Sequence, residues 1–207
     1  MNARLQLTIQ ELLNTKELIP AERRQHLDGL AVLISGQLRS GEVVLNFICT
    51  HNSRRSQISQ AWAMACSVWY GLKGISCVSG GTEVTAFNRR AVRALSDQGF
   101  DLKLKVNTAN PGYELWMGDQ IIVEMYSKTY QQATLEPFIA IMTCSHADEN
   151  CPLVVGATAR YSLPFIDPGH SDGAPNEAAV YLETANQIGR EMLYLFSGIS
   201  PALETGQ

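Results

Sequence analysis

The chain has 207 residues, of which 45% are hydrophobic and 17% are charged, a composition that excludes a largely disordered protein. Its length suits one folded domain with an added element. The formal net charge of -4 excludes a general attraction to nucleic acid or to anionic membranes, although it is compatible with a local basic site for a small anion.

Residues 1–40 are predicted to form two helices, a helical N-terminal extension to a main domain over residues 41–207. Thr8 and Glu11 can form a capping box for the first helix, and Pro20 suits the first turn of the second. An apolar stripe runs along the second helix at Leu27, Leu30, Ala31, Ile34 and Leu38. We expect this stripe to be buried against the main domain or against a second copy of the chain, so a homodimer through these helices is one expectation.

Four short apolar runs in the main domain have the length and composition of buried strands. They cover residues 43–48, 75–79, 120–125 and 138–143. Helical patterns alternate with these runs and cover residues 58–66, 88–98 and 177–197. This alternation predicts a parallel sheet with right-handed crossovers, in which ligands bind beyond the carboxyl ends of the strands. The stretches 105–118 and 167–176, rich in Pro, Gly, Asn and Asp, are predicted loops.

Five cysteines are an odd number on irregular spacings, which favours reduced thiols over a disulfide framework. No run of about 18 apolar residues is present, and Arg4, Gln6 and Glu11 interrupt the first segment where a secretory core would be continuous. We therefore expect a cytoplasmic protein whose partners include neither nucleic acid nor a membrane.

The segment from Cys49 to Ser56 joins the first predicted strand to a helix. Several backbone N–H groups and a helix N-terminus can therefore converge on one tetrahedral oxyanion, and the same field holds Cys49 as a nucleophilic thiolate. Arg55 can bind two oxyanion oxygens with its guanidinium fork, and Ser56 can donate its hydroxyl to the thiolate. The simpler interpretation is a cysteine buried at the end of a core strand.

This loop resembles the signature of the low-molecular-weight protein tyrosine phosphatases and of the thioredoxin-coupled arsenate reductases that share their fold. The signature is Cys-x5-Arg-Ser with Asn in the fourth place, and it is matched by Cys49, Asn52, Arg55 and Ser56. The resemblance extends over residues 43–197 and includes SGGT at 79–82, where the family usually has Ser-Ala-Gly, and NRRAVRALSDQGFD after it. It implies a flavodoxin-like α/β fold, a four-stranded parallel sheet with helices on both faces.

The resemblance also includes a late Asp-Pro pair, Asp167-Pro168. In the family this aspartate is the general acid that protonates the leaving oxygen, whereas an Asp-Pro pair alone is typical of a turn. Two positions depart from the family: His51 stands where Gly is common, and Arg54 stands where a second Cys is common. The change to His could reshape the loop if that position needs φ > 0. Arg54 removes a thiol that can protect the nucleophile, and it adds positive charge beside the oxyanion. The simpler interpretation is that the side chains of His51 and Arg54 both lie at the solvent-facing rim of the loop.

A second cysteine pair distinguishes the two branches of the family. Cys144 and Cys151 enclose the segment CSHADENC, and the resemblance implies a relay in which Cys49 attacks arsenate, Cys144 attacks Cys49 and releases arsenite, and Cys151 captures Cys144. The final disulfide would be reduced by thioredoxin. Zinc binding by Cys144, His146 and Cys151 matches no common structural spacing, and two inert thiols are the remaining alternative.

We therefore predict an arsenate reductase that needs neither a cofactor nor a metal. The predicted catalytic residues are Cys49, Arg55, Asp167, Cys144 and Cys151. The predicted oxyanion-binding residues are Thr50, His51, Asn52, Ser53, Arg54, Arg55 and Ser56. One alternative is a phosphatase that hydrolyses phosphomonoesters through a cysteinyl-phosphate with Cys49, Arg55 and Asp167. A second alternative is a non-catalytic oxyanion-binding protein whose N-terminal helices bind a partner.

Overall fold

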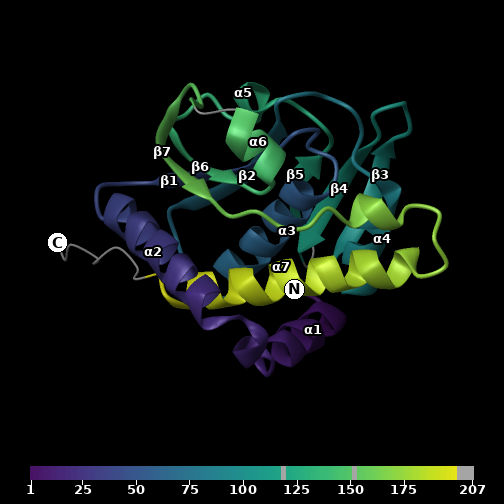
Figure 1. The fold of residues 1–207 in the computed structure, drawn as a ribbon, viewed down its shortest axis with the longest axis horizontal. Helices are drawn as coiled ribbons and strands as arrows, with labels where there is room; N and C mark the ends of the chain where they lie inside the picture. The colour runs from purple at the N-terminus through teal and green to yellow at the C-terminus, as the bar shows by residue number, and fades with distance from the viewer. Residues whose placement is uncertain (118–119, 151–152, 200–207) are drawn as a thin grey trace.

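The computed structural model describes residues 1–117, 120–150 and 153–199. Its centre is a four-stranded parallel sheet in the order β2-β1-β6-β7 (Figure 1). The strands are β1 (Val43–Cys49), β2 (Ile75–Gly81), β6 (Phe138–Met142) and β7 (Ala157–Ser162). Almost every side chain of β1 and β6 is buried, as expected for central parallel strands covered on both faces. The predicted four-stranded parallel sheet is therefore confirmed.

Helices cover both faces of this sheet (Figure 1). On one face, Leu45 and Phe47 of β1 pack in a large core with residues of α3 (Arg55–Trp69) and α7 (Glu177–Ser197). On the other face, Ile48 packs in a smaller cluster with residues of α5 (Tyr130–Ala133) and α6 (Ser145–Asn150). The helix α4 (Arg89–Asp97) lies beside α7, so the predicted helices at 88–98 and 177–197 are both confirmed.

The two predicted N-terminal helices are present as α1 (Ala3–Leu13) and α2 (Ala21–Leu38), with a short 3-10 helix at Lys16–Leu18 between them. The first helix begins earlier than expected, because the side chain of Asn2 accepts from the N–H of Leu5, and Thr8 lies inside the helix. Both helices pack against α7 (Figure 1). All five residues of the α2 stripe are at most 4% exposed, so the chain itself buries the stripe. The homodimer remains a prediction, but the buried stripe is no longer an argument for it.

A second, antiparallel sheet corrects part of the expected organisation. It consists of β3 (Asp101–Val106), β4 (Gly112–Met117) and β5 (Gln120–Met125), in that order. Residues 120–125 therefore form a strand as predicted, but in this sheet and not in the parallel one. The predicted loop at 105–118 contains the end of β3 and the whole of β4. The fourth parallel strand is β7, whose half-exposed sequence ATARYS lacks the apolar run that marks a buried strand. No helix in the described ranges has both the length and the apolar character needed to cross a membrane.

Candidate active site

The carboxyl end of β1 places Cys49 at the centre of the site. Cys49 is 3% exposed, and its α-carbon pairs in register with that of Gly81 at the end of β2. The loop that follows runs to Arg54, the N-cap residue of α3. A β-carbon added to Gly81 would lie 2.7 Å from the carbonyl oxygen of Thr50, so only glycine lets β2 approach the loop this closely. At Gly80, where the family usually has Ala, an added β-carbon would lie 2.2 Å from the α-carbon of Tyr130.

The loop has one left-handed residue, Asn52, which is fully buried. Its φ is 46°, and it is the only non-glycine with positive φ in the described part of the chain. Asn is one of the few residues that adopt this conformation readily. The positive φ therefore falls on Asn52 and not on His51, so His can replace the family's Gly there without backbone strain.

The side chain of Asn52 organises the serines around the thiol. Its Nδ2 donates to Ser56 Oγ and Ser79 Oγ, both at 2.9 Å. Its Oδ1 accepts from the N–H of Lys128 and from Gln57 Nε2, both at 3.1 Å. Because Ser56 Oγ accepts from Asn52, its own proton is free to be donated to the Cys49 Sγ that lies 3.1 Å away. This hydrogen bond holds the Cys49 sulfur beside Ser56 at the centre of the loop.

The peptide groups of the loop are oriented for binding an anion. The carbonyl oxygens of residues 49–54 all accept hydrogen bonds from the protein, for example from Glu83 N to Thr50 O and from Ser127 Oγ to His51 O, both at 2.8 Å. The peptide N–H groups of residues 50–54, in contrast, donate to no group within the described ranges. A loop with its carbonyls turned into the protein and its N–H groups unpaired is suited to bind an oxyanion.

Arg55 and Asp167, far apart in the sequence, meet at this loop. Arg55 Nη2 lies 2.6 Å from Asp167 Oδ2, and Arg55 Nη1 donates to the carbonyl oxygen of Phe165 at 3.1 Å. The Nε of Arg55 is buried and has no partner in the described ranges, so its N–H is available to donate to an oxyanion. Asp167 also accepts from the N–H of Gly169 as the N-cap of a 3-10 helix at Pro168–Ser171, within the predicted loop 167–176.

The side chain of Arg54 turns towards α7. Its Nε donates to the hydroxyl of Tyr181 at 2.8 Å, its Nη2 donates to Asp172 Oδ2 at 3.2 Å, and its Nη1 lies 3.7 Å from Asp167 Oδ1. Burial, together with donation to Asp172, raises the pKa of Tyr181 to about 12, so its hydroxyl stays protonated. Arg54 is therefore fixed in place, whereas His51 is about half exposed and lies 3.5 Å from Glu83.

Cys144 follows β6 and lies beside the nucleophile's loop. It is fully buried, belongs to the same apolar cluster as Cys49, and has its Sγ 3.6 Å from Thr50 Oγ1. The N–H of Ala147 donates to this sulfur at 3.3 Å, and Thr50 Oγ1 is also 3.2 Å from His146 Nδ1. Cys151 lies outside the described residues. Among those described, no cluster of three or more His, Cys, Asp or Glu side chains is arranged to hold a metal ion.

Three elements of the site were not predicted from the sequence. Tyr181 and Asp172 fix Arg54, Ser127 fixes the loop carbonyl of His51, and the backbone of Lys128 fixes Asn52. Lys128 is 7% exposed, and burial lowers the pKa of its ammonium group to about 8. None of these residues belongs to a local sequence motif. Ser127 and Lys128 lie just after β5, where the chain leaves the second sheet and reaches the site.

Comparisons with known proteins place the chain in a family and show proteins of similar fold. The family model for low molecular weight phosphotyrosine protein phosphatase matches residues 44–137. The chain is similar to an arsenate reductase of Halalkalibacterium halodurans, with 27% identity over 151 residues that cover 72% of this chain and 91% of the relative. It is similar to an arsenate reductase of Brevibacillus brevis, with 30% identity over 59% of this chain and 74% of the relative. A solved structure of a YwlE mutant from Bacillus subtilis has a similar fold, with a TM-score of 0.52 at 13% identity over 75% of this chain and 97% of that one.

Proposed function

We propose that this chain, which belongs to the low-molecular-weight phosphotyrosine protein phosphatase superfamily close to its arsenate reductase branch, catalyses the reduction of arsenate. The proposal depends on one observation, the placement of Cys144. A second buried thiol 3.6 Å from Thr50, the residue that follows the nucleophile, has no task in phosphate ester hydrolysis. It is suited to attack an adduct on Cys49.

In the first step, the Cys49 thiolate attacks the arsenic atom of arsenate while the loop N–H groups and Arg55 bind its oxygens. Asp167, held beside Arg55, protonates the leaving oxygen, so that water departs and a sulfur–arsenic(V) bond forms. Arg55 must exchange part of its contact with Asp167 for the oxyanion, and its unpaired Nε is the donor already free to do so.

In the second step, the Cys144 thiolate attacks the sulfur of Cys49. A disulfide forms, the sulfur–arsenic bond breaks, and its electron pair stays with arsenic, which leaves as arsenite. Cys151 then attacks Cys144 and frees Cys49. We propose that thioredoxin reduces the resulting Cys144–Cys151 disulfide, and that the reaction takes place in the cytoplasm, where thiol reductants are available.

Phosphomonoester hydrolysis is the second candidate, because the family model that matches the chain is that of a phosphatase. The match covers residues 44–137, which include Cys49 and Arg55. Hydrolysis of a cysteinyl-phosphate needs the oxyanion loop, Asp167 and a water molecule, so the same site supports both reactions. The two activities are therefore separable only through the second thiol.

The proposal is tested with purified chain and its Cys144→Ser variant. Each is assayed with arsenate in the presence of thioredoxin, thioredoxin reductase and NADPH, and separately with p-nitrophenyl phosphate. We expect arsenate-dependent NADPH oxidation by the wild type and its loss in Cys144→Ser, with hydrolysis of the ester unchanged. Equal arsenate reduction by both proteins would refute the relay. Ester hydrolysis without arsenate reduction would establish the phosphatase, and turnover of neither substrate would favour the non-catalytic oxyanion-binding protein.

A further inference from the structure

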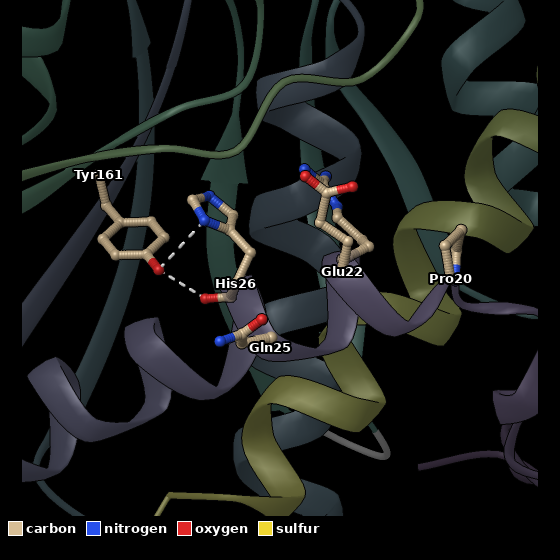
Figure 2. Close-up of a pocket in the computed structure, with 6 residues that line it drawn as sticks. Pro20, Glu22, Gln25, His26 and Tyr161 are labelled. Atoms are coloured by element: carbon tan, nitrogen blue, oxygen red, sulfur yellow. Dashed lines mark hydrogen bonds between the residues drawn. The ribbon is translucent and has the colours of Figure 1, made fainter.

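The N-terminal extension contacts the segment that leads to the active-site aspartate. His26 Nε2 lies 2.5 Å from the carbonyl oxygen of Ser162, and the hydroxyl of Tyr161 donates to the carbonyl oxygen of His26 at 2.5 Å. Figure 2 shows these two side chains turned towards one another from α2 and β7. The helix α2 is therefore joined to the end of β7, immediately before the chain enters the active site.

Arg23, one turn earlier on α2, makes the contacts that come nearest to the site. Its Nε lies 2.8 Å from Glu191 Oε2 on α7, and its Nη2 donates to the carbonyl oxygen of Pro164 at 3.1 Å. Its guanidinium also lies 5.1 Å from the ring centre of Phe165. The Glu191 side chain is only 3% exposed and accepts from Gln187 Nε2 as well, so Arg23 is attached to a fixed, buried carboxylate.

The segment that Arg23 contacts is bound at its other side by the active-site arginine. Phe165 accepts at its carbonyl oxygen from Arg55 Nη1 at 3.1 Å, and its N–H donates to the carbonyl oxygen of Thr143 beside Cys144. Asp167 follows two residues later and pairs with Arg55. A continuous set of contacts therefore leads from Glu191 through Arg23 and Phe165 to Arg55.

We propose that Arg23 is a positioning residue for Arg55, and that the N-terminal extension thereby completes the oxyanion site. The inference rests on the proposed function only in that Arg55 binds the oxyanion. Arginine suits this place because its planar fork contacts Glu191 and Pro164 at once while its face lies over Phe165, which a lysine cannot do. Residue 23 lies in the N-terminal extension, outside the region 44–137 that matches the family model.

The test measures binding of inorganic phosphate to the reduced full chain by titration calorimetry, which needs the oxyanion loop and Arg55 but no turnover. We expect Arg23→Met to weaken phosphate binding about tenfold, because a misplaced guanidinium loses a charge-assisted bidentate contact. Arg23 lines an open pocket of about 600 Å³, so the methionine side chain meets no steric obstacle. Arg55→Lys provides the reference loss, and adding Arg23→Met to it should weaken binding no further.

Two further variants separate positioning from folding. Arg23→Met leaves Glu191 buried without its cation, so the pair Arg23→Met/Glu191→Gln should regain thermal stability while phosphate binding stays about tenfold weaker. Arg4→Met is the matched control, because Arg4 is also an arginine of the extension that donates to a backbone carbonyl of the main domain, that of Asp97 at the end of α4. Its phosphate affinity should equal that of the wild type.

Wild-type affinity in the pair variant, or fully additive losses from Arg23→Met and Arg55→Lys, would overturn the inference and leave the proposed function standing. A wild-type protein that binds no phosphate would overturn the oxyanion site itself, and the role of Arg23 with it.

Discussion

Replacing the buried Lys128 by Met should stabilise the protein, and by more at neutral than at alkaline pH. Lys128 is 7% exposed, and its ammonium group lies 3.3 Å from the carbonyl oxygen of Tyr126 and 4.4 Å from the ring centre of that residue. Burial lowers its pKa from 10.5 to about 8. The unfolded chain therefore binds this proton more tightly than the folded chain does. Burying the charged Lys128 lowers the free energy of unfolding, and this cost disappears as the pH rises from about 8 to 10.5.

The magnitude follows from the difference between the two pKa values. About 2.5 pH units at roughly 1.36 kcal/mol each correspond to a cost of about 3 kcal/mol, which is present in full below pH 8. At pH 9.5 only about 1 kcal/mol of that cost remains. Lys128→Met removes the titrating group, so its stability advantage over the wild type should shrink by about 2 kcal/mol between pH 7 and pH 9.5.

Urea unfolding of the two reduced proteins at both pH values measures this difference. Other groups that titrate in this range, including the remaining thiols and tyrosines, are present in both proteins, so their effects cancel. The backbone N–H of residue 128, which donates to Asn52, is kept in the variant, and its activity should be unchanged. A stability difference that stays constant within about 0.5 kcal/mol would refute the assignment of Lys128 as a buried, destabilised cation.

Three substitutions test the site and the relay. Cys49→Ser should abolish turnover while circular dichroism and phosphate binding stay as in the wild type, and retained turnover would remove Cys49 as the nucleophile. Asn52→Ala should lower the free energy of unfolding by at least about 1–2 kcal/mol and reduce turnover, because Ala adopts positive φ poorly and leaves Ser56 without its donor; unchanged unfolding would contradict this. Asp148→Ala should speed disulfide formation between Cys144 and Cys151 about threefold, because the Asp148 carboxylate binds α6 to Arg160 and Ser162. Peptide mapping after a single turnover measures this rate. An unchanged rate would show that these contacts do not limit the movement of Cys144 towards Cys151.

The oxyanion loop and the strand before it could be predicted because everything that forms them is contiguous in the sequence. An apolar run, a short loop with Asn52 and Arg55, and an apolar helical stripe define a strand-loop-helix unit without knowledge of any partner. The Asp167 contact with Arg55 was accessible only through resemblance to a family, since an Asp-Pro pair alone indicates a turn.

The parts that could not be predicted depend on contacts between distant segments. The apolar run at 120–125 is compatible with a parallel or an antiparallel sheet. Its partner strand, β4, lies in a stretch rich in turn-forming residues, so the sequence indicated a loop there. The edge strand β7 has one polar face, and its pairing with β6 is decided by tertiary packing. The support of Arg54 by Tyr181 and of Phe165 by Arg23 joins residues more than 120 positions apart, for which local periodicity carries no information.

The surroundings of the four described thiols assign them to two classes, and this division bears on the proposed relay. Burial raises the pKa of Cys66 well above its ordinary value and the pKa of Cys77 to about 12, so neither forms a thiolate at neutral pH. Cys49 and Cys144 belong to the smaller apolar cluster, where their sulfurs lie 3.1 Å from Ser56 Oγ and 3.6 Å from Thr50 Oγ1. Arg54 occupies the place of the family's second loop cysteine and is bound to Tyr181, so the loop itself holds no thiol besides Cys49. In the proposed relay, the replacement of the family's second loop cysteine by Arg54 leaves Cys144 to take up the oxidation of Cys49.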